Sequence, residues 1–214
     1  MLDRKTTLLE LYARLYNAFG PRHWWPADSG FEVAVGAILT QNTAWRNVTK
    51  AITNLKAAHL LAPRSLHDVP IRELAEAIRP AGYFNVKARR LKNFVDFLFE
   101  ESDGDFERFF TKDLHALRDE LLSVNGIGPE TADSILLYAG NKPTFVVDAY
   151  TKRIFVRHKL ISEEARYGEL QALFMNNLEQ DTTMFNEYHA LLVYVGKHFC
   201  KSNPRCSQCP MDGL

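Results

Sequence analysis

Two features of the chain are suited to chemistry: a lone carboxylate, Asp148, and a glycine-containing turn at residues 124–131 that precedes it. A carboxylate can stabilise the positive charge that develops on a sugar when its glycosidic bond breaks, and it can orient a water molecule for attack. An aspartate that opens a helix is more often only a helix cap. Both interpretations of Asp148 are open at this point.

The turn has the composition of a phosphate-binding loop. Gly126 and Gly128 follow the end of an apolar helix pattern, and Pro129 suits the first turn of a new helix. Such a turn directs backbone N–H groups and a positive helix terminus outward, where a phosphate group can bind. Contacts of this kind grip a nucleic acid without reading its sequence.

All three cysteines, Cys200, Cys206 and Cys209, fall within ten residues near the end of the chain. The chain shows no apolar leader, so we expect a reducing, cytosolic environment in which disulfides are disfavoured. An odd number of clustered cysteines then favours metal ligation over disulfide pairing.

Tryptophan and proline gather in a second cluster. Trp24, Trp25 and Pro26 are consecutive, and Trp45 follows in the segment QNTAW. Aromatic side chains are usually part of a core, but two adjacent tryptophans before a proline cannot both face the core of one helix. At least one is therefore expected to line a cleft. For Tyr83 and Phe84 we expect packing against the preceding proline instead.

The elements that must position these residues are helices. Apolar residues recur at helical spacing in residues 8–16, 48–55 and 91–98, and proline or glycine separates the segments. No alternation of strands and helices is found. The run from Gly140 to Pro143 is the clearest break after the turn.

Composition agrees with a globular chain. The 214 residues are 46% hydrophobic and 24% charged, and no apolar run is long enough to span a membrane. The net charge of +0 excludes a uniformly basic surface, so nucleic-acid binding would need local patches. Two basic patches exist, although a solvated helix face is the commoner explanation of each: Lys87, Arg89, Arg90 and Lys92, and Lys152, Arg153, Arg157 and Lys159.

The turn at 124–131 resembles a helix-hairpin-helix motif, and with Asp148 downstream it resembles the DNA glycosylases of the endonuclease III superfamily. The resemblance spans most of the chain. It implies an all-α, two-lobed fold with a C-terminal Cys-rich loop of iron–sulfur type. One lobe would be a six-helix unit over residues 22–140 that carries the hairpin, and residues 1–21 would join residues 141–214 in the second lobe.

The resemblance implies that Asp148 is the catalytic carboxylate, which activates water. Lyase members of the superfamily carry a Schiff-base lysine at the position of Glu130, and a carboxylate cannot form that adduct. The implied enzyme is therefore monofunctional, with Lys142 or Lys152 as alternative amines. Phosphate contacts are implied for the hairpin residues Gly126, Gly128, Glu130 and Thr131.

A narrower resemblance rests on the segments HWWP, QNTAW and RPAGYFNVKARR. These look like the bacterial 3-methyladenine DNA glycosylases of the same superfamily. The resemblance implies that an extruded, positively charged alkylpurine is stacked between electron-rich rings, while Gln41 fills the hole in the duplex. The implied pocket consists of Trp24, Trp25, Pro26 and Trp45, of which Trp45 stands where other members have phenylalanine.

The cysteine spacing is similar to that of the iron–sulfur loop of endonuclease III, whose fourth ligand would fall one residue beyond Leu214. The resemblance thus implies a [4Fe–4S] cluster on Cys200, Cys206 and Cys209, with a zinc site completed by His198 as the alternative. We expect a monomeric, cytoplasmic, nucleoid-associated protein whose partner is double-stranded DNA with damaged bases. The alternatives are a glycosylase/AP lyase for oxidised pyrimidines or mismatched bases, and a non-catalytic damage-binding protein.

Overall fold

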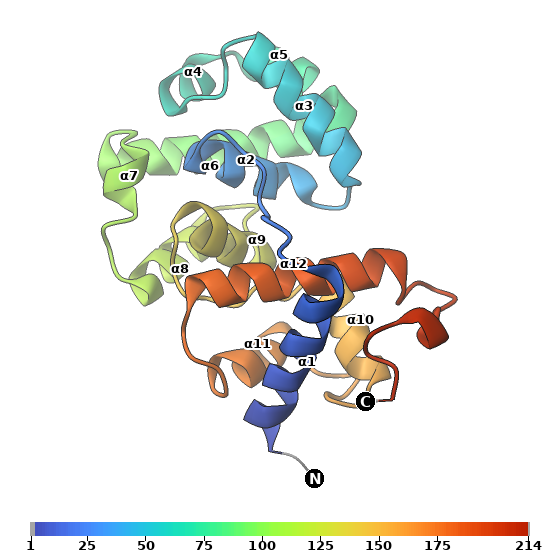
Figure 1. Ribbon diagram of the computed structural model, residues 1–214. Helices are drawn as coiled ribbons and strands as arrows, with labels where there is room; N and C mark the ends of the chain where they lie inside the picture. The colour runs from blue at the N-terminus through green and yellow to red at the C-terminus, as the bar shows by residue number, and fades with distance from the viewer. Residues whose placement is uncertain (1–2, 214) are drawn as a thin grey trace. The chain divides into compact units, whose positions relative to one another are not determined.

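The computed structural model describes residues 3–213 and builds most of them into helices (Figure 1). Within that range no residue belongs to a β-strand, which confirms the predicted all-α class. None of the helices described there combines the length and apolar composition needed to cross a lipid bilayer. The α-helices are α1 Arg4–Phe19, α2 Gly30–Thr40, α3 Trp45–Ala57, α4 Pro63–Asp68, α5 Ile71–Ala77, α6 Phe84–Ser102, α7 Phe106–Phe109, α8 Leu114–Ser123, α9 Pro129–Ser134, α10 Ala149–Arg157, α11 Tyr167–Met175 and α12 Thr182–His198. Three short segments are η1 Arg79–Ala81, η2 Ile135–Ala139 and η3 Cys206–Gln208.

The chain divides into two compact units. The terminal unit is formed by Met1–Pro26 and Pro143–Leu214, and the central unit by Ala27–Lys142. The division expected from sequence, with boundaries at residues 22 and 140, stays a prediction.

The core of the terminal unit is aromatic. The rings of Phe145 and Phe174 stack with centroids 3.6 Å apart, and Tyr188 of α12 meets both rings edge-on. The hydroxyl of Tyr188 donates a hydrogen bond of 3.0 Å to the carbonyl oxygen of Leu8. Helix α1 is thereby fixed to α12, and its apolar face is buried in the core.

Helix α2 is the innermost helix of the central unit. Every residue from Phe31 to Leu39 is buried, because α3, α6, α9 and η2 all pack against it. Ser29 caps its first turn by accepting from the backbone N–H of Glu32. The carboxylate of Glu32 is buried but is neutralised by Lys56 at 2.8 Å, as a buried charge requires.

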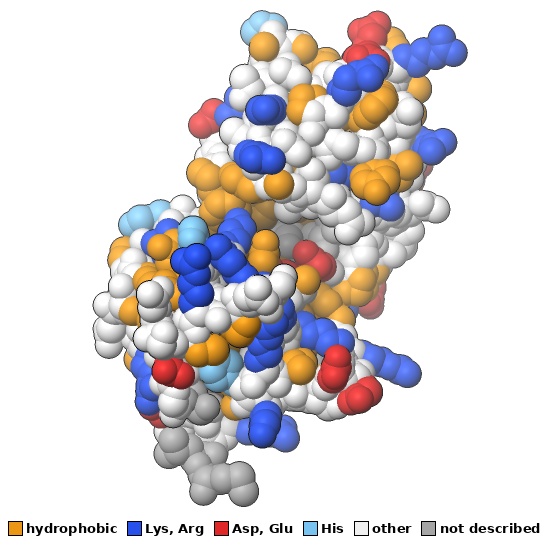
Figure 2. Space-filling view, turned by 90° about the vertical axis from the view of Figure 1, so that its right-hand side faces the viewer, with side chains coloured by type: hydrophobic (Ala, Val, Ile, Leu, Met, Phe, Trp, Pro, Cys, Tyr) orange, Lys and Arg blue, Asp and Glu red, His pale blue; other side chains and the backbone are white. Residues whose placement is uncertain are grey.

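The two basic patches lie in different units, the first in the central unit and the second in the terminal unit. On the face shown in Figure 2, Lys and Arg side chains are interspersed with acidic and hydrophobic ones. Lys87 is 1% exposed, and its ammonium group donates to the carbonyl oxygens of Leu39 at 2.9 Å and Ala81 at 2.8 Å. Burial, together with the nearby charge of Arg90, lowers the pKa of Lys87 to about 8. For Lys87 the solvated-face interpretation is therefore wrong: it ties the end of α2 to η1.

Candidate active site and nucleic-acid interface

Asp148 stands at the start of α10. Its Oδ1 accepts hydrogen bonds from the backbone N–H of Thr151 at 2.7 Å and from the Thr151 hydroxyl at 2.9 Å. These bonds cap the helix and fix the orientation of the carboxylate. The side chain is only 13% exposed, and its Oδ2 faces His189, whose Nε2 lies 3.8 Å away. Oδ1 thus caps the helix, whereas Oδ2 takes no part in the cap and can serve in catalysis.

Helix α12 supplies two titratable neighbours of Asp148. Burial lowers the pKa of His189, which is therefore neutral near pH 7, although the charge of Asp148 opposes the shift. Burial also lowers the pKa of Lys197, again with Asp148 acting in the opposite direction. The ammonium group of Lys197 lies 5.9 Å from the centre of the Trp24 ring. Sequence reasoning missed both residues, which lie about two turns apart on one helix.

The aromatic residues of the predicted pocket come from both units. In the terminal unit, the half-buried rings of Trp24 and Trp25 lie 5.2 Å apart, and Pro26 is exposed. Trp24 is near Lys197 and hence near the surroundings of Asp148. Trp45 belongs to the central unit, where it is the first residue of α3 and is partly exposed.

The predicted hairpin forms between α8 and α9 in the central unit. Gly126 has a φ of +98°, a conformation that strongly favours glycine, and the backbone N–H of Ile127 closes the turn on the carbonyl of Val124 at 3.0 Å. Ile127 is buried and anchors the turn, whereas Gly128 and Pro129 are exposed. The turn therefore presents its second half to solvent.

Gln41, which follows α2, is bonded to this hairpin. Its Nε2 donates to the carbonyl oxygen of Gly126 at 3.0 Å and to the hydroxyl of Thr131 at 2.9 Å. Its Oε1 accepts from the guanidinium of Arg90. The structure thus brings together three residues that the sequence analysis singled out and adds Arg90 to them as a direct partner.

The two hairpin glycines are expected to respond differently to alanine. A methyl group at Gly126 would meet the Arg90 side chain at 2.3 Å and would also be strained by the positive φ, so Gly126→Ala should destabilise the protein by about 2 kcal/mol.

A methyl group at Gly128 would meet nothing within 4 Å. Gly128→Ala should therefore leave the urea midpoint unchanged and weaken binding to any duplex, because the methyl group obstructs a backbone contact with phosphate. Unchanged affinity of Gly128→Ala at matched salt would contradict phosphate binding at the turn.

The lysines considered as alternative amines are engaged by backbone groups. The ammonium of Lys142 donates to the carbonyl oxygen of Lys112 at 2.8 Å, and that of Lys152 donates to Ala165 at 2.9 Å. Glu130 is exposed in the first turn of α9. Each lysine would have to give up its hydrogen bond before it could attack a sugar.

The three cysteines line one small cavity of about 110 Å³ that is bounded by α10, α12 and the loop after α12. Cys200 is buried, and burial raises the pKa of the Cys209 thiol. Within residues 3–213 no group of three or more acidic, histidine or cysteine side chains has the geometry of a metal site. His198 is not part of the cavity lining, because its ring packs on Tyr194 with centroids 4.3 Å apart. The expectation that His198 completes a zinc site is therefore not supported.

Two arginines of α10 hold the cysteine-containing loop. Arg153 donates to the carbonyl oxygens of Gly196 at 2.9 Å and Cys200 at 2.7 Å. Arg157 donates to the Cys200 sulfur at 3.3 Å and to the carbonyl oxygen of Lys201 at 2.5 Å. The second basic patch is thus partly structural, which its sequence did not reveal.

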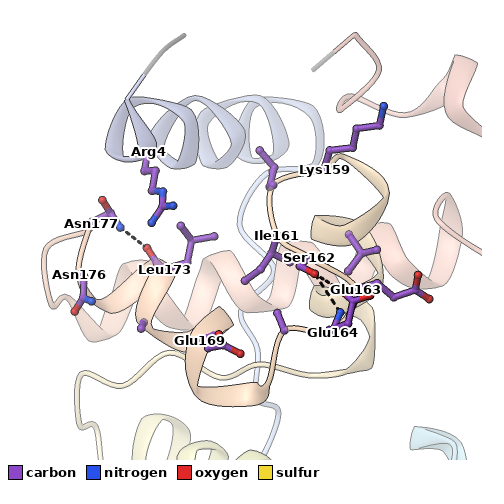
Figure 3. A pocket seen from close by; sticks show the side chains of 14 residues that line it. Arg4, Lys159, Ile161, Ser162, Glu163, Glu164, Glu169, Leu173, Asn176 and Asn177 are labelled. Carbon is purple, nitrogen blue, oxygen red and sulfur yellow. Dashed lines mark hydrogen bonds between the residues drawn. The ribbon is translucent and has the colours of Figure 1, made fainter.

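A cavity of the terminal unit with a volume of about 970 Å³ is lined by none of the predicted site residues. It lies between the start of α1, the loop at 159–165 and α11, and Figure 3 shows Arg4, Glu169 and Asn177 around it. The Glu164 carboxylate there accepts from the hydroxyl of Ser162. Volume alone therefore does not identify the active site.

The prediction that Tyr83 packs against the preceding proline is wrong. Tyr83 is 72% exposed and has a φ of +47° at the start of α6. Phe84 is partly exposed, and the guanidinium of Arg79 lies 4.7 Å from the centre of its ring, so its packing against the proline stays a prediction.

The all-α architecture, the solvent-facing glycine hairpin and the aspartate that opens a helix after it are the features expected of a helix-hairpin-helix protein. Residues 35–180 match the family model described as the HhH-GPD superfamily base excision DNA repair protein. The chain belongs to this superfamily, which makes it an enzyme of the DNA glycosylase family.

Known relatives support the same assignment. The chain is 49% identical to a Methanocaldococcus jannaschii protein named as a candidate DNA repair glycosylase, over 95% of this chain and 93% of the relative. It is 32% identical to the crystal structure of the Helicobacter pylori 3-methyladenine DNA glycosylase MagIII bound to 1,N6-ethenoadenine, with a TM-score of 0.78 over 92% of this chain and 98% of that one. A trapped endonuclease III–DNA covalent intermediate has the same fold, with a TM-score of 0.83 at 23% identity over 99% of this chain and 94% of that one.

Proposed function

We propose that the protein is a monofunctional DNA glycosylase that hydrolyses the N-glycosidic bond of alkylated purines, above all 3-methyladenine, after flipping the nucleotide out of the duplex. The observation that carries the proposal is the carboxylate of Asp148. The side chain is little exposed; one of its oxygens is fixed by the helix cap, and the other lies 3.8 Å from a neutral imidazole. A fixed carboxylate of this kind can stabilise an oxocarbenium-like sugar and take a proton from the attacking water.

Alkylated purines are the proposed substrates because the implied pocket is rich in electron-rich rings. Methylation at N3 or N7 gives the base a positive charge, which makes it a good leaving group and favours stacking on tryptophan. Trp24, Trp25, Pro26 and Trp45 are the proposed pocket residues, and Gln41 is the proposed wedge. The likeness to the H. pylori 3-methyladenine glycosylase supports this choice of substrate.

The absence of strand cleavage is proposed from Glu130. A carboxylate there cannot form a Schiff base, and the hydrogen bonds of Lys142 and Lys152 to backbone carbonyls oppose their use as substitutes. The product would be an abasic site on an intact strand. The protein would act as a cytoplasmic monomer on double-stranded DNA of the nucleoid.

We also propose that Cys200, Cys206 and Cys209 are three of the four ligands of a [4Fe–4S] cluster, although the three side chains do not have the geometry of a metal site in this structure. The three cysteines line one cavity, and thiolate is the ligand that iron–sulfur clusters require. Bound there, the group would fasten the loop after α12, and Lys201 and Arg205 of that loop would be available for phosphate.

A second candidate function is removal of oxidised pyrimidines or mismatched bases. The observations that favour it are 28% identity to the Sulfolobus acidocaldarius endonuclease III over 84% of this chain, and 25% identity to a Pyrobaculum aerophilum thymine/uracil-DNA glycosylase over 96% of it. Glu130 and the tryptophan-rich segments weigh against it.

Base release from methylated duplex DNA tests the proposal directly. Chromatography of the freed bases should detect 3-methyladenine, and a denaturing gel should show strand breaks only after alkali treatment. Breaks without alkali would contradict monofunctional chemistry and point to an amine. If no methylated base is released, oxidised pyrimidine and mismatch substrates become the next test. Failure with all lesions would leave a non-catalytic damage-binding protein.

A further inference from the structure

Arg90 of α6 lies directly against the hairpin. Its aliphatic stem covers Gly126 so closely that a methyl group on that glycine would fall 2.3 Å from Cγ, 2.9 Å from Cδ and 3.0 Å from Nε. The guanidinium continues past the glycine and donates from Nη1 to Oε1 of Gln41. Arg90 therefore touches both the turn that would bind phosphate and the side chain that would enter the duplex.

The guanidinium of Arg90 is hydrogen-bonded to a neutral group and not to a carboxylate. Its acceptor is the neutral amide oxygen of Gln41, whereas the other guanidinium packed near α9, that of Arg118, is neutralised by Asp133 at 2.8 Å. The charge of Arg90 also contributes to lowering the pKa of Lys87. None of the ion pairs found in residues 3–213 includes Arg90, so a phosphate oxygen would give its guanidinium a charged acceptor in place of a neutral one.

The other members of the first basic patch are placed differently. Lys87 is buried on backbone carbonyls, and Lys92 donates to the carbonyl oxygens of Leu66 and His67. Arg89, one position before Arg90 on α6, is exposed to solvent. Within this patch, Arg90 is the member whose side chain covers Gly126 of the turn.

We propose that Arg90 is a phosphate-binding residue of the hairpin, and that its transfer from Gln41 to a DNA phosphate releases Gln41 for insertion into the duplex. The proposal rests on the proposed function, in which the hairpin binds DNA. A phosphate oxygen is a charged acceptor and forms a stronger bond with a guanidinium than an amide oxygen does. Once Arg90 turns to the phosphate, Gln41 has lost one of its three hydrogen bonds, and its release is completed when its two Nε2 bonds to Gly126 and Thr131 break on insertion.

The test measures binding of the full chain to an undamaged duplex over a series of salt concentrations. Arg90→Met keeps the stem that covers Gly126 and removes the charge. It should reduce the slope of log affinity against log salt by about 1, as the loss of one phosphate contact does. The same reduction is expected when Arg90→Met is made in a Gln41→Ala background. Arg89→Met is the matched control, since it removes the same charge from the adjacent position, and it should change the slope less.

The outcomes separate the possible roles of Arg90. If the effect of Arg90→Met disappears in the Gln41→Ala background, Arg90 only positions Gln41 and the proposal is overturned. Equal effects of Arg89→Met and Arg90→Met would overturn it as well, because they would indicate general charge attraction. If the parent protein shows no salt-dependent binding at all and Gly128→Ala changes nothing, the proposed function fails together with this inference.

Release of Gln41 has its own readout. The side-chain NH₂ resonances of Gln41, assigned by comparison with Gln41→Ala, should move when the duplex is added to ¹⁵N-labelled parent protein. In Arg90→Met they should already lie toward the released position before DNA is added. Resonances that are identical in the parent and in Arg90→Met without DNA would overturn the release step.

Discussion

Asp148→Asn is expected to slow base release from methylated duplex DNA by about 10²–10⁴-fold under single-turnover conditions. The amide is neutral, so it cannot stabilise an oxocarbenium-like sugar or accept a proton from water. Asparagine caps helices as well as aspartate does, so the bond from the Thr151 N–H to the side-chain oxygen should persist. The thermal midpoint should therefore change little, and the loss would be one of chemistry rather than of folding.

Thr151→Val is the matched control for Asp148→Asn. It removes the hydroxyl that donates to Oδ1 at 2.9 Å and leaves the carboxylate in place. Its effect on base release should be far smaller than that of Asp148→Asn. If Asp148→Asn released the base as fast as the parent at every enzyme concentration, Asp148 would be excluded as the catalytic carboxylate.

The free energy of unfolding is expected to increase between about pH 8 and pH 10.5 because of the buried Lys87. The pKa of Lys87 is about 8 in the folded protein and near its ordinary value of 10.5 in the unfolded chain. Between these values the unfolded chain binds more protons than the folded protein. The contribution of Lys87 to the free energy of unfolding therefore rises with pH across this window, by up to about 3 kcal/mol.

Lys87→Met isolates this contribution. Urea unfolding of the parent and of Lys87→Met should be compared at intervals from pH 7 to pH 10.5. The stability of the parent relative to Lys87→Met is expected to increase with pH above pH 8, because the buried ammonium group becomes a neutral amine. All other titrating groups are common to the two proteins and cancel in the difference. A difference that stays constant with pH would mean that Lys87 keeps its ordinary pKa despite its burial.

The sequence predicted the features that depend on neighbouring residues. Helical periodicity located α1, α3 and α6, and glycine with proline located the hairpin, because these signals act within a few residues. The position of Asp148 at a helix start was visible for the same reason. Assignment of a catalytic role to Asp148 came from resemblance and stays a prediction.

Features that depend on distant residues were not predictable. Lys87, Arg90 and Arg153 were indistinguishable in sequence from lysines and arginines on a solvated surface. Their acceptors are between 6 and 49 positions away, and only folding brings them within hydrogen-bond distance. The exposed ring of Tyr83 has a similar origin, since the left-handed backbone there directs it away from the packing that its aromatic character suggested.

The attachment of the cysteine-containing loop by Arg153 and Arg157 has a consequence for the tolerance of the loop to substitution. These arginines bind the carbonyl oxygens of Cys200 and Lys201, which every amino acid possesses, and only the bond from Arg157 to the Cys200 sulfur requires a cysteine. The position of the loop therefore depends little on its thiols. The chain path after α12 should persist when Cys206 or Cys209 is replaced, because neither residue accepts a hydrogen bond from Arg153 or Arg157.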